Sequence, residues 1–392
     1  MAPVEGFTTS GNGIGPSVAA LHAALASVID PELRRPITDL GMVKEVTADD
    51  DGRVHAVVLL TIAGCPMRDT IRADAARALA GVDGVTDVEV ELTAMTVAQR
   101  QALKEQLQGP GGTRGIVFNE PGSLTRVYAV ASGKGGVGKS SVTVNLACAM
   151  AAKGLRVGIV DADIYGFSVP GLMGLTTNGV TQSPTRVDEM ILPPVAFGVK
   201  VISIGMFITG NQPVAWRGPM LHRALEQFLT DVYFGDLDVL FLDLPPGTGD
   251  VTISVAQLLP KAEILVVTTP QAAAAEVAER AGAIALQTGQ KVAGVIENMS
   301  YLTLPDGSAM DLFGSGGGGL LAQRLSQTMN APVPLLGQIP LEIALREGGD
   351  SGAPIVLSTP DAASARALQG IADRLAVRPR GLAGLKLDVR PS

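Results

Sequence analysis

The chain has 392 residues, a formal net charge of −8 and only two cysteines, Cys65 and Cys148. Its length suggests two or three domains, and a hydrophobic share of 46% provides for a sizeable core. The acidic balance argues against nucleic-acid binding, which requires a basic surface, and two cysteines do not make a disulfide framework. Because no signal-peptide pattern and no long apolar stretch is present, we expect a cytoplasmic protein without membrane association.

The first hundred residues predict a compact α+β domain. Helical patterns occupy residues 17–28 and 68–79, and strand patterns occupy residues 53–62 and 86–92. A segment rich in glycine and proline follows and shows little periodicity, which is typical of a linker. We place the small domain at residues 17–104 and the linker at residues 105–124.

Strands and helices alternate from Arg126 onward, which predicts a parallel sheet flanked by helices. The expected strands are apolar throughout, as in sheets covered on both faces, and span residues 127–131, 157–160, 199–203, 239–243, 264–268 and 292–298. Helices are expected to begin near Lys139, Pro219, Asp250, Gln271 and Gly319. The fold class is therefore α/β for residues 125–380, which a tail at residues 381–392 follows.

The most informative motif lies between the first of these strands and the helix that follows it. It reads Ser132, Gly133, Lys134, Gly135, Gly136, Val137, Gly138, Lys139, Ser140 and Ser141. Glycines in such a loop let backbone N–H groups face a phosphate, while Lys139 supplies charge to the β- and γ-phosphates. The hydroxyl of Ser140 is a ligand for Mg²⁺. We therefore predict that residues 133–141 bind a nucleotide and Mg²⁺.

Two later strands end in acids. Asp161 and Asp163 follow the strand at residues 157–160, and Asp243 ends the strand at residues 239–243. The carboxyl ends of parallel strands meet at one edge of a sheet, where ligands bind. We expect Asp243 to polarise magnesium-bound water and Asp161 to act in the metal shell or as a structural partner. Asp163 orients the attacking water or caps a helix after Gly166.

Lys134 is a second lysine that an ordinary phosphate loop does not need. It resembles the signature lysine of the deviant Walker A class, which includes the MinD, ParA, arsenite-pump and nitrogenase-iron-protein ATPases. The resemblance implies a homodimer with ATP between the subunits, in which Lys134 reaches the nucleotide of the partner. It also implies that Asp163 activates water and that Asn298, at the end of a strand, binds adenine. The alternative for Lys134 is a solvated loop lysine.

Longer stretches resemble the Mrp/ApbC/Nbp35 group of P-loop ATPases, known as iron–sulfur cluster carriers. They are residues 132–141, 161–166, 216–219, 243–250, 297–301 and 313–318. The N-terminal module resembles the MIP18-type (DUF59) domain at residues 30–32 and 39–43, at Thr61 and at Cys65-Pro66. The resemblance implies an ATP-hydrolysing homodimer that transfers clusters to apoproteins, with client or assembly proteins as partners. It leaves the roles of Trp216 and Arg217 open.

The chain departs from this group at one important place. The group carries a Cys-Pro-x-Cys motif after the Asn-Met-Ser-Tyr segment, and this motif binds a cluster between two subunits. Here Leu304 and Gly307 occupy the two cysteine positions, and neither side chain can ligate iron. Cys148 is expected to be a buried side chain of a helix. Cys65 stands at a strand-to-helix turn, where a helix N-terminus can lower its pKa, so it is either a cluster thiol or a structural cysteine.

Three functions therefore stay open. The first is an ATP-hydrolysing cluster carrier, and the second is a nucleotide-switched scaffold that carries no cluster. The missing cysteine pair favours the scaffold. The third is a positioning ATPase similar to MinD or ParA, against which the acidic balance and the group-specific motifs count. Iron and sulfide analysis of anaerobically purified protein distinguishes the first two.

Overall fold

The computed structural model describes residues 16–108, 115–164, 166–207, 218–247, 249–271, 285–304 and 306–376. The chain divides into two compact units. The smaller comprises Met1–Thr113 and Thr185–Leu192, and the larger comprises Arg114–Pro184 and Pro193–Ser392. A short segment from the middle of the chain is therefore part of the N-terminal unit, which the domain boundaries expected from the sequence do not include.

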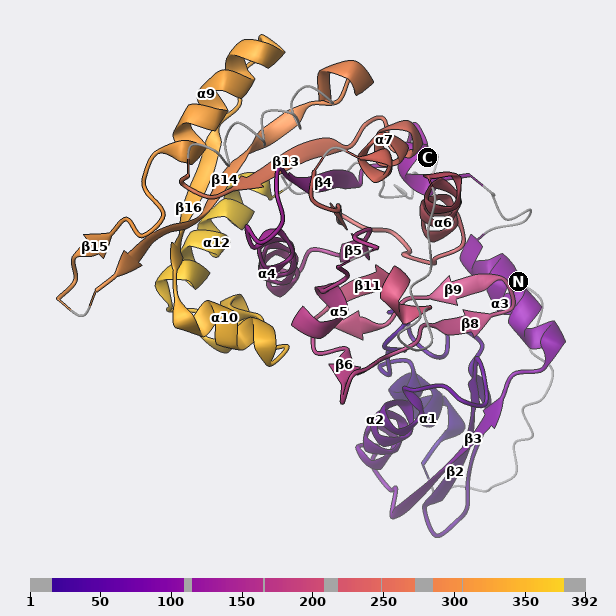
Figure 1. Cartoon of the computed structure of the whole chain (residues 1–392). Coiled ribbons are helices and arrows are strands. Elements are labelled where there is room, and N and C mark those ends of the chain that lie inside the picture. Colours follow the sequence, from indigo (N-terminus) through magenta and orange to yellow (C-terminus); the bar gives the residue numbers. More distant parts are fainter. Residues whose placement is uncertain are drawn as a thin grey trace, which may run out of the picture. The chain divides into compact units, whose positions relative to one another are not determined.

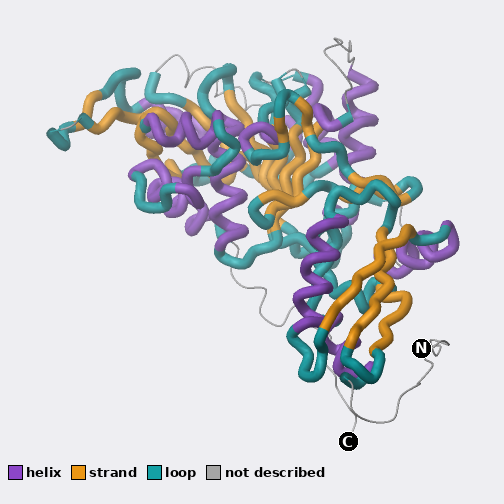
Figure 2. Tube along the Cα trace, turned by 90° about the horizontal axis from the view of Figure 1, so that it is seen from below, coloured by secondary structure: helices purple, strands orange, loops and turns teal. Residues whose placement is uncertain are grey.

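The smaller unit is a three-stranded sheet with helices. Its elements are α1 (Val18–Leu25), β1 (Val43–Ala48), β2 (Arg53–Leu60), α2 (Arg68–Ala80), β3 (Asp87–Ala94) and α3 (Val97–Gln108). β2 is central, antiparallel to β1 and parallel to β3. The side chain of Ser17 accepts a hydrogen bond from the N–H of Ala20 and caps α1. Figure 2 shows a helix lying along these strands. The added segment is a hairpin of β8 (Thr185–Val187) and β9 (Met190–Leu192).

The larger unit is built on one nine-stranded sheet. The strand order is β10-β11-β5-β12-β4-β13-β14-β15, and β16 also pairs with β14. Figure 1 labels most of these strands, among them β11, β5, β4, β13 and β14. The bounds are β4 (Arg126–Ser132), β5 (Val157–Asp161), β10 (Val195–Ala196), β11 (Val199–Ser203), β12 (Val239–Asp243), β13 (Glu263–Thr268), β14 (Val292–Thr303), β15 (Ala309–Met310) and β16 (Leu335–Leu341). All pairs are parallel except β10 with β11 and β14 with β15. The expected fold class, a parallel sheet flanked by helices, is confirmed.

Helices cover this sheet. They are α4 (Lys139–Ala152), α5 (Val169–Leu172), α6 (Gly218–Thr230), α7 (Asp250–Leu258), α9 (Gly317–Met329), α10 (Ile343–Asp350), α11 (Ile355–Ser358) and α12 (Ala363–Leu375). α4 packs against β5, β12, α11 and α12, and ten of its residues are buried. Small side chains at most of its positions make this burial possible. In the described part of the chain, every helix is too short or too polar to cross a lipid bilayer.

Short elements complete the larger unit. They are β6 (Thr176–Thr177), β7 (Val180–Thr181) and the 3₁₀ turns η1 (Val117–Asn119) and η2 (Ile204–Met206). η1 falls inside the segment that the sequence predicts to be a linker. The side chain of Asn119 donates a hydrogen bond to the carbonyl of Leu258 at 2.6 Å, so this part of the linker packs on the larger unit.

The expected strands agree with the structure to within one or two residues, except that β14 extends to Thr303. The pattern predicts neither α3 nor β16, and it does not predict α10 to α12. The helix expected near Gln271 falls mainly on residues outside the described ranges, as do Trp216, Arg217 and the C-terminal tail.

The centre of the sheet contains a buried aromatic pair, which supports a first prediction. The rings of Tyr128 and Phe241 stack with centroids 5.6 Å apart. We expect Phe241→Ala to lower the free energy of unfolding by about 3–5 kcal/mol, because the truncation leaves a cavity between tightly packed strands. Urea denaturation followed by circular dichroism measures this loss. The control is Phe197→Ala at an exposed phenylalanine, which should cost less than about 0.5 kcal/mol. Equal costs in the two variants would contradict the packing argument.

Candidate functional site: a phosphate-loop cavity

The glycine motif forms the turn between β4 and α4. Gly136 and Gly138 adopt φ angles of +78° and +80°, which L side chains rarely adopt. A Cβ atom on Gly138 would lie 2.2 Å from the Asn298 amide nitrogen, so this position also requires glycine for space. The loop and the start of α4 line a cavity of about 280 Å³. The other lining residues include Asp163, Gly166, Ser168, Leu172 and Pro246.

Asp243, at the end of β12, joins three side chains of α4. Its carboxylate lies 2.7 Å from the Lys139 ammonium and 2.5 Å from the Ser140 hydroxyl. The hydroxyl of Thr143 donates to its other oxygen at 2.8 Å. Asp243 is fully buried and Lys139 nearly so. The structure therefore places together the lysine, the hydroxyl and the carboxylate that the sequence assigns to phosphate and metal. Thr143 is a further member, which the sequence analysis missed.

Asp161 ends the neighbouring strand in register with Asp243. Burial raises the pKa of its carboxyl group to about 8, and the negative charge of Asp243 adds to this effect. One oxygen accepts hydrogen bonds from the Ser203 hydroxyl at 3.1 Å and from the Val169 N–H at 3.3 Å. The other accepts from the Asp163 N–H at 3.1 Å. These contacts fit the structural alternative for Asp161, because they attach three later parts of the chain to the end of β5.

Asp163 follows Asp161 by two residues and lines the cavity. Its carboxylate accepts a hydrogen bond from the N–H of Gly166 at 3.1 Å. Gly166 lies in the loop before α5, which begins at Val169, so this hydrogen bond closes a turn and is not the helix cap expected from the sequence. Because the side chain also lines the cavity, this turn contact leaves the expected orientation of water by Asp163 as a prediction.

Lys134 is not a free loop lysine in this structure. Its ammonium group donates a hydrogen bond to the side-chain carbonyl of Gln271 at 2.6 Å. Gln271 follows β13, the strand beside β4. The sequence pattern does not predict this contact of Gln271, since a glutamine after a strand carries no motif. This contact holds the lysine at the rim of its own cavity.

Asn298 lies behind the phosphate loop. Its amide donates to the carbonyl of Val137 at 2.9 Å, while its buried Oδ1 atom finds no hydrogen-bond partner in the described part of the chain. The next residue, Met299, has a φ of +59°, and the pairing of β14 with β16 shifts register at this point. Strained backbone of this kind is concentrated at ligand sites. An unpaired acceptor here suits a donor such as a purine amino group.

The glycine-rich segment at residues 314–319 leads into α9, and two of its glycines lie close to other parts of the chain. Gly318 donates its N–H to a carboxylate oxygen of Glu297 at 2.6 Å, at the start of α9. A Cβ atom on Gly318 would lie 2.8 Å from the Glu297 side chain, and one on Gly317 only 2.3 Å from the Pro270 carbonyl. The buried Glu297 therefore occupies the N-terminus of α9, and the glycines allow this close approach.

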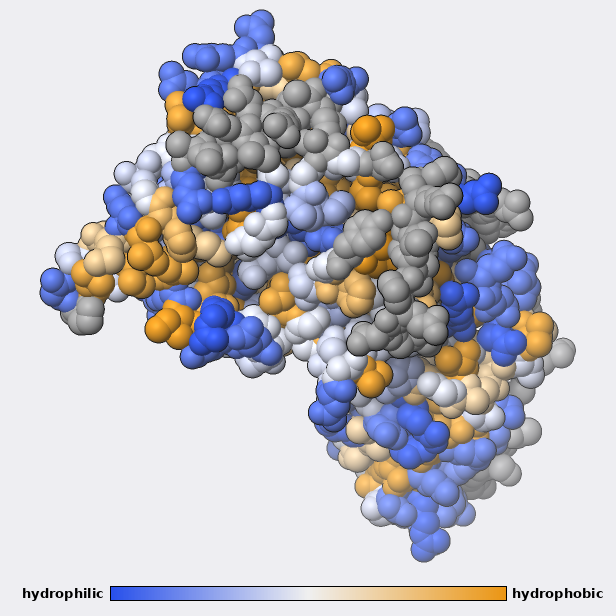
Figure 3. Space-filling model, in the orientation of Figure 1, coloured by the Kyte–Doolittle hydropathy of each residue, from blue (hydrophilic) through white to orange (hydrophobic). Residues whose placement is uncertain are grey.

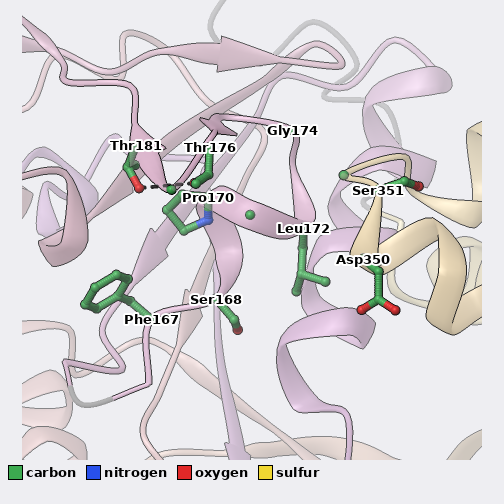
Figure 4. A pocket seen from close by; sticks show the side chains of 13 residues that line it. Phe167, Ser168, Pro170, Leu172, Gly174, Thr176, Thr181, Asp350 and Ser351 are labelled. Atoms are coloured by element: carbon green, nitrogen blue, oxygen red, sulfur yellow. Dashed lines mark hydrogen bonds between the residues drawn. The ribbon is translucent and has the colours of Figure 1, made fainter.

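A second cavity, of about 470 Å³, lies beside the first and shares Ser168 and Leu172 with it. Figure 4 shows the side chains around it, which come from α5, from β6 and β7 and from the end of α10. The hydroxyls of Thr176 and Thr181 are hydrogen-bonded at 3.1 Å across the two strands. The larger unit thus has two adjoining cavities on the side of α5.

Cys65 lies in the smaller unit, on the loop between β2 and α2, and only 3% of its surface is exposed. Its thiol lies 3.9 Å from a carboxylate oxygen of Glu32. Burial raises the pKa of this thiol to about 11, and the charges of Glu32 and Asp30 also act in that direction. The expectation that the start of α2 lowers the pKa is therefore wrong. The favourable contact with that backbone is outweighed by desolvation and by two carboxylates.

Cys148 is fully buried in α4, as expected for a small apolar side chain, and burial raises the pKa of its thiol to about 12. Among the described residues, no group of three or more His, Cys, Asp or Glu side chains is arranged to hold a metal ion. The segment with Leu304 and Gly307 joins β14 to β15. Exposed apolar side chains follow it at Met310, Leu312 and Leu320. Figure 3 shows hydrophobic residues gathered where Figure 1 places β15.

Comparisons with known proteins show which families the two parts of the chain match. Residues 123–376 match the family described as the NUBPL iron-transfer P-loop NTPase, and residues 19–92 match an iron–sulfur cluster assembly protein family. The chain belongs to the iron-transfer P-loop NTPase family. The resemblance to cluster carriers, together with a MIP18-type module, is thereby confirmed.

Relatives of this protein match over nearly the whole chain. The iron–sulfur cluster carrier protein of Mycobacterium tuberculosis is 62% identical over 383 residues, which is 98% of this chain and 99% of the relative. The carrier protein of Synechocystis is 42% identical over 359 residues, 91% of this chain and 96% of the relative. A solved structure of the nucleotide-binding protein from Archaeoglobus fulgidus, in complex with ADP, is 36% identical with a TM-score of 0.50. The match covers 58% of this chain and 86% of the Archaeoglobus fulgidus chain.

The raised pKa of Cys65 predicts a pH dependence of stability. The unfolded thiol ionises near its ordinary pKa of 9.0, whereas the folded one stays protonated up to about 11. The folded state therefore binds more protons between these values, and stability falls as the pH rises through this window. We expect the urea midpoint to fall less in Cys65→Ala than in the original protein between about pH 8 and about pH 10.5. Cys148 and Tyr128 titrate in both proteins, so the comparison removes their effect. Parallel pH profiles would contradict the raised pKa.

Proposed function

We propose that the protein is a Mg²⁺-dependent ATPase that carries iron–sulfur clusters to apoproteins as a homodimer with nucleotide between its subunits. The observation that carries this proposal is the convergence of Lys139, Ser140 and Asp243 at one cavity beneath a glycine loop. Membership of the iron-transfer NTPase family supports an iron–sulfur cluster as the cargo. The ADP bound to the Archaeoglobus fulgidus relative supports an adenine nucleotide as the ligand of the cavity.

The residues fit a nucleotide and a magnesium ion. Backbone N–H groups of the loop and the start of α4 suit phosphate oxygens, and the unpaired Oδ1 of Asn298 suits the amino group of adenine. Ser140 and Asp243 supply the hard oxygen ligands that Mg²⁺ prefers, and Asp161 lies beside them in register. When bound, Mg²⁺ neutralises charge on the transferring phosphate.

Lys139 must change partner for this chemistry. In the present structure its ammonium is paired with Asp243 at 2.7 Å. Release from Asp243 allows Lys139 to bind the β- and γ-phosphates and frees the carboxylate for the metal and its water. Asp163, at the wall of the same cavity, then orients the water that attacks the γ-phosphate. The chain's contribution to hydrolysis is thus positioning and charge stabilisation.

Lys134 makes a second exchange in this proposal. Its hydrogen bond to Gln271 satisfies the ammonium while the protomer is alone. In the dimer the lysine leaves Gln271 and contacts the nucleotide of the partner subunit. The exposed apolar side chains of Met310 and Leu312 lie near the segment that, in the resembling group, faces the other subunit. They support self-association through this edge of the sheet.

A nucleotide-switched scaffold without a cluster is the second candidate. Two observations favour it: Leu304 and Gly307 replace the cysteine pair, and the remaining thiols of Cys65 and Cys148 are buried. A cluster needs deprotonated thiolates, which burial disfavours at both positions.

Alanine substitutions of the two loop lysines distinguish nucleotide binding from ATP hydrolysis. We expect Lys139→Ala to lose ATP hydrolysis and to bind Mg·ATP at least about tenfold more weakly, because a charge-assisted phosphate contact is lost. Lys134→Ala should lose hydrolysis by at least about 100-fold but keep nucleotide binding within about threefold. Phosphate release and isothermal titration calorimetry measure the two properties. Lys44→Ala, at an exposed lysine of β1, is the control. Hydrolysis by Lys134→Ala at the original rate would refute the cross-subunit role.

Anaerobic reconstitution tests the cargo. We expect brown protein containing bound iron and sulfide, and we expect Cys65→Ala to take up less of both, whereas Cys148→Ala takes up as much as the original protein. Iron and sulfide analysis after gel filtration provides the measurement. A colourless original protein would favour the scaffold, and equal uptake by all three proteins would remove Cys65 from the cluster site.

A further inference from the structure

The β8–β9 hairpin is hydrogen-bonded to the part of the smaller unit that contains Cys65. Although its residues lie in the middle of the chain, they group with the N-terminal unit. Thr185, the first residue of β8, donates its hydroxyl to a carboxylate oxygen of Glu32 at 2.7 Å. The other oxygen of the same carboxylate is the one 3.9 Å from the Cys65 thiol. Glu32 thus joins the hairpin directly to the cysteine.

Buried apolar side chains and two ion pairs also attach the hairpin to the smaller unit. Val187, Met190 and Leu192 are buried, and they lie on one face because Val187 pairs with Met190 and Thr185 with Leu192. At the turn, Asp188 lies 3.6 Å from the Arg100 guanidinium, and Glu189 lies 3.9 Å from the Lys104 ammonium. Both basic side chains belong to α3. Apolar burial, one buried hydrogen bond and two ion pairs therefore hold the hairpin.

Two residues that flank this hairpin in the chain, Val169 and Ser203, are hydrogen-bonded to Asp161 at the end of β5. Val169 precedes the hairpin in the chain and Ser203 follows it. The N–H of Val169 and the hydroxyl of Ser203 both donate to the same oxygen of Asp161. Asp161 lies in register with Asp243, the carboxylate that contacts Lys139 and Ser140. Asp161 is therefore a shared hydrogen-bond acceptor for residues on both sides of the hairpin in the chain.

We propose that the β8–β9 hairpin is an intramolecular lid over the Cys65–Glu32 pair, and that nucleotide binding in the phosphate-loop cavity loosens it through Asp243 and Asp161. With the lid in place, Cys65 is shielded and Glu32 is held by Thr185. With the lid withdrawn, the thiol and one carboxylate oxygen face solvent or a client protein. The lid itself depends only on contacts within the smaller unit. Its coupling to nucleotide rests on the proposed function.

Alkylation of Cys65 by iodoacetamide tests the lid in the full-length protein. The rate is read by peptide mass spectrometry, and Cys148, fully buried in the larger unit, serves as the internal reference. We expect slow modification of Cys65 in the original protein. Reversing the turn charges, with Asp188→Lys and Glu189→Lys, places like charges against α3 and should raise the Cys65 rate at least about tenfold. Thr185→Val, which removes only the hydroxyl donor, should raise it by a smaller factor.

The matched control restores the ion pairs with opposite polarity. Adding Arg100→Asp and Lys104→Glu to the reversed turn should return the Cys65 rate to within about threefold of the original. An unchanged Cys65 rate in the reversed-turn variant, or equal acceleration at Cys148, would overturn the lid. The second outcome would mean general loosening of the fold.

The coupling is tested with Mg²⁺ and a non-hydrolysable ATP analogue, whose binding is verified by calorimetry on the same sample. Saturating analogue should raise the Cys65 rate at least about threefold and leave the Cys148 rate unchanged. A constant Cys65 rate with the analogue bound would overturn the coupling. Failure of the analogue to bind would instead count against the proposed function, so the two outcomes are distinguishable.

Discussion

The organisation of the larger unit depends on one buried ion pair, between Lys139 and Asp243. A lone carboxylate at the fully buried position of Asp243 would be strongly unfavourable, so the fold must provide it with partners. Lys139, Ser140 and Thr143 all lie on the first turns of α4, and they reach Asp243 because the phosphate loop places this helix over the end of β12. The same pairing means that a phosphate and a cation can enter only if they replace contacts of equal strength.

Much of this arrangement follows from the sequence because it depends on local rules. Apolar strands that end in acids, and a glycine loop that leads into a helix, predict the sheet and the edge where ligands bind. The positions of Asp161 and Asp243 follow from strand ends, and those of Lys139 and Ser140 follow from the glycine loop that leads into α4. Thr143 and Gln271 could not be found in this way, since a threonine within a helix and a glutamine after a strand carry no pattern of their own.

The misjudged pKa of Cys65 has a clear physical origin. Sequence reasoning identified the nearby start of α2, a short-range effect that favours the thiolate. It could not show that Glu32, distant in sequence, brings a second carboxylate to the thiol, or that Thr185 comes from another part of the chain to fix that carboxylate. Long-range contacts of this kind decide desolvation, and desolvation is the largest contribution to the pKa of Cys65.

The placement of the β8–β9 hairpin also bears on how such a two-part protein evolves. Two family models match the chain one after the other, as though separate genes had been joined end to end. Yet the peptide crosses between the units at three points, not one: after Thr113, before Thr185 and after Leu192. An N-terminal module exchanged with that of a distant relative would meet a hairpin shaped for different neighbours. A cut through the linker alone would therefore leave one segment of the smaller unit, Thr185–Leu192, on the larger fragment.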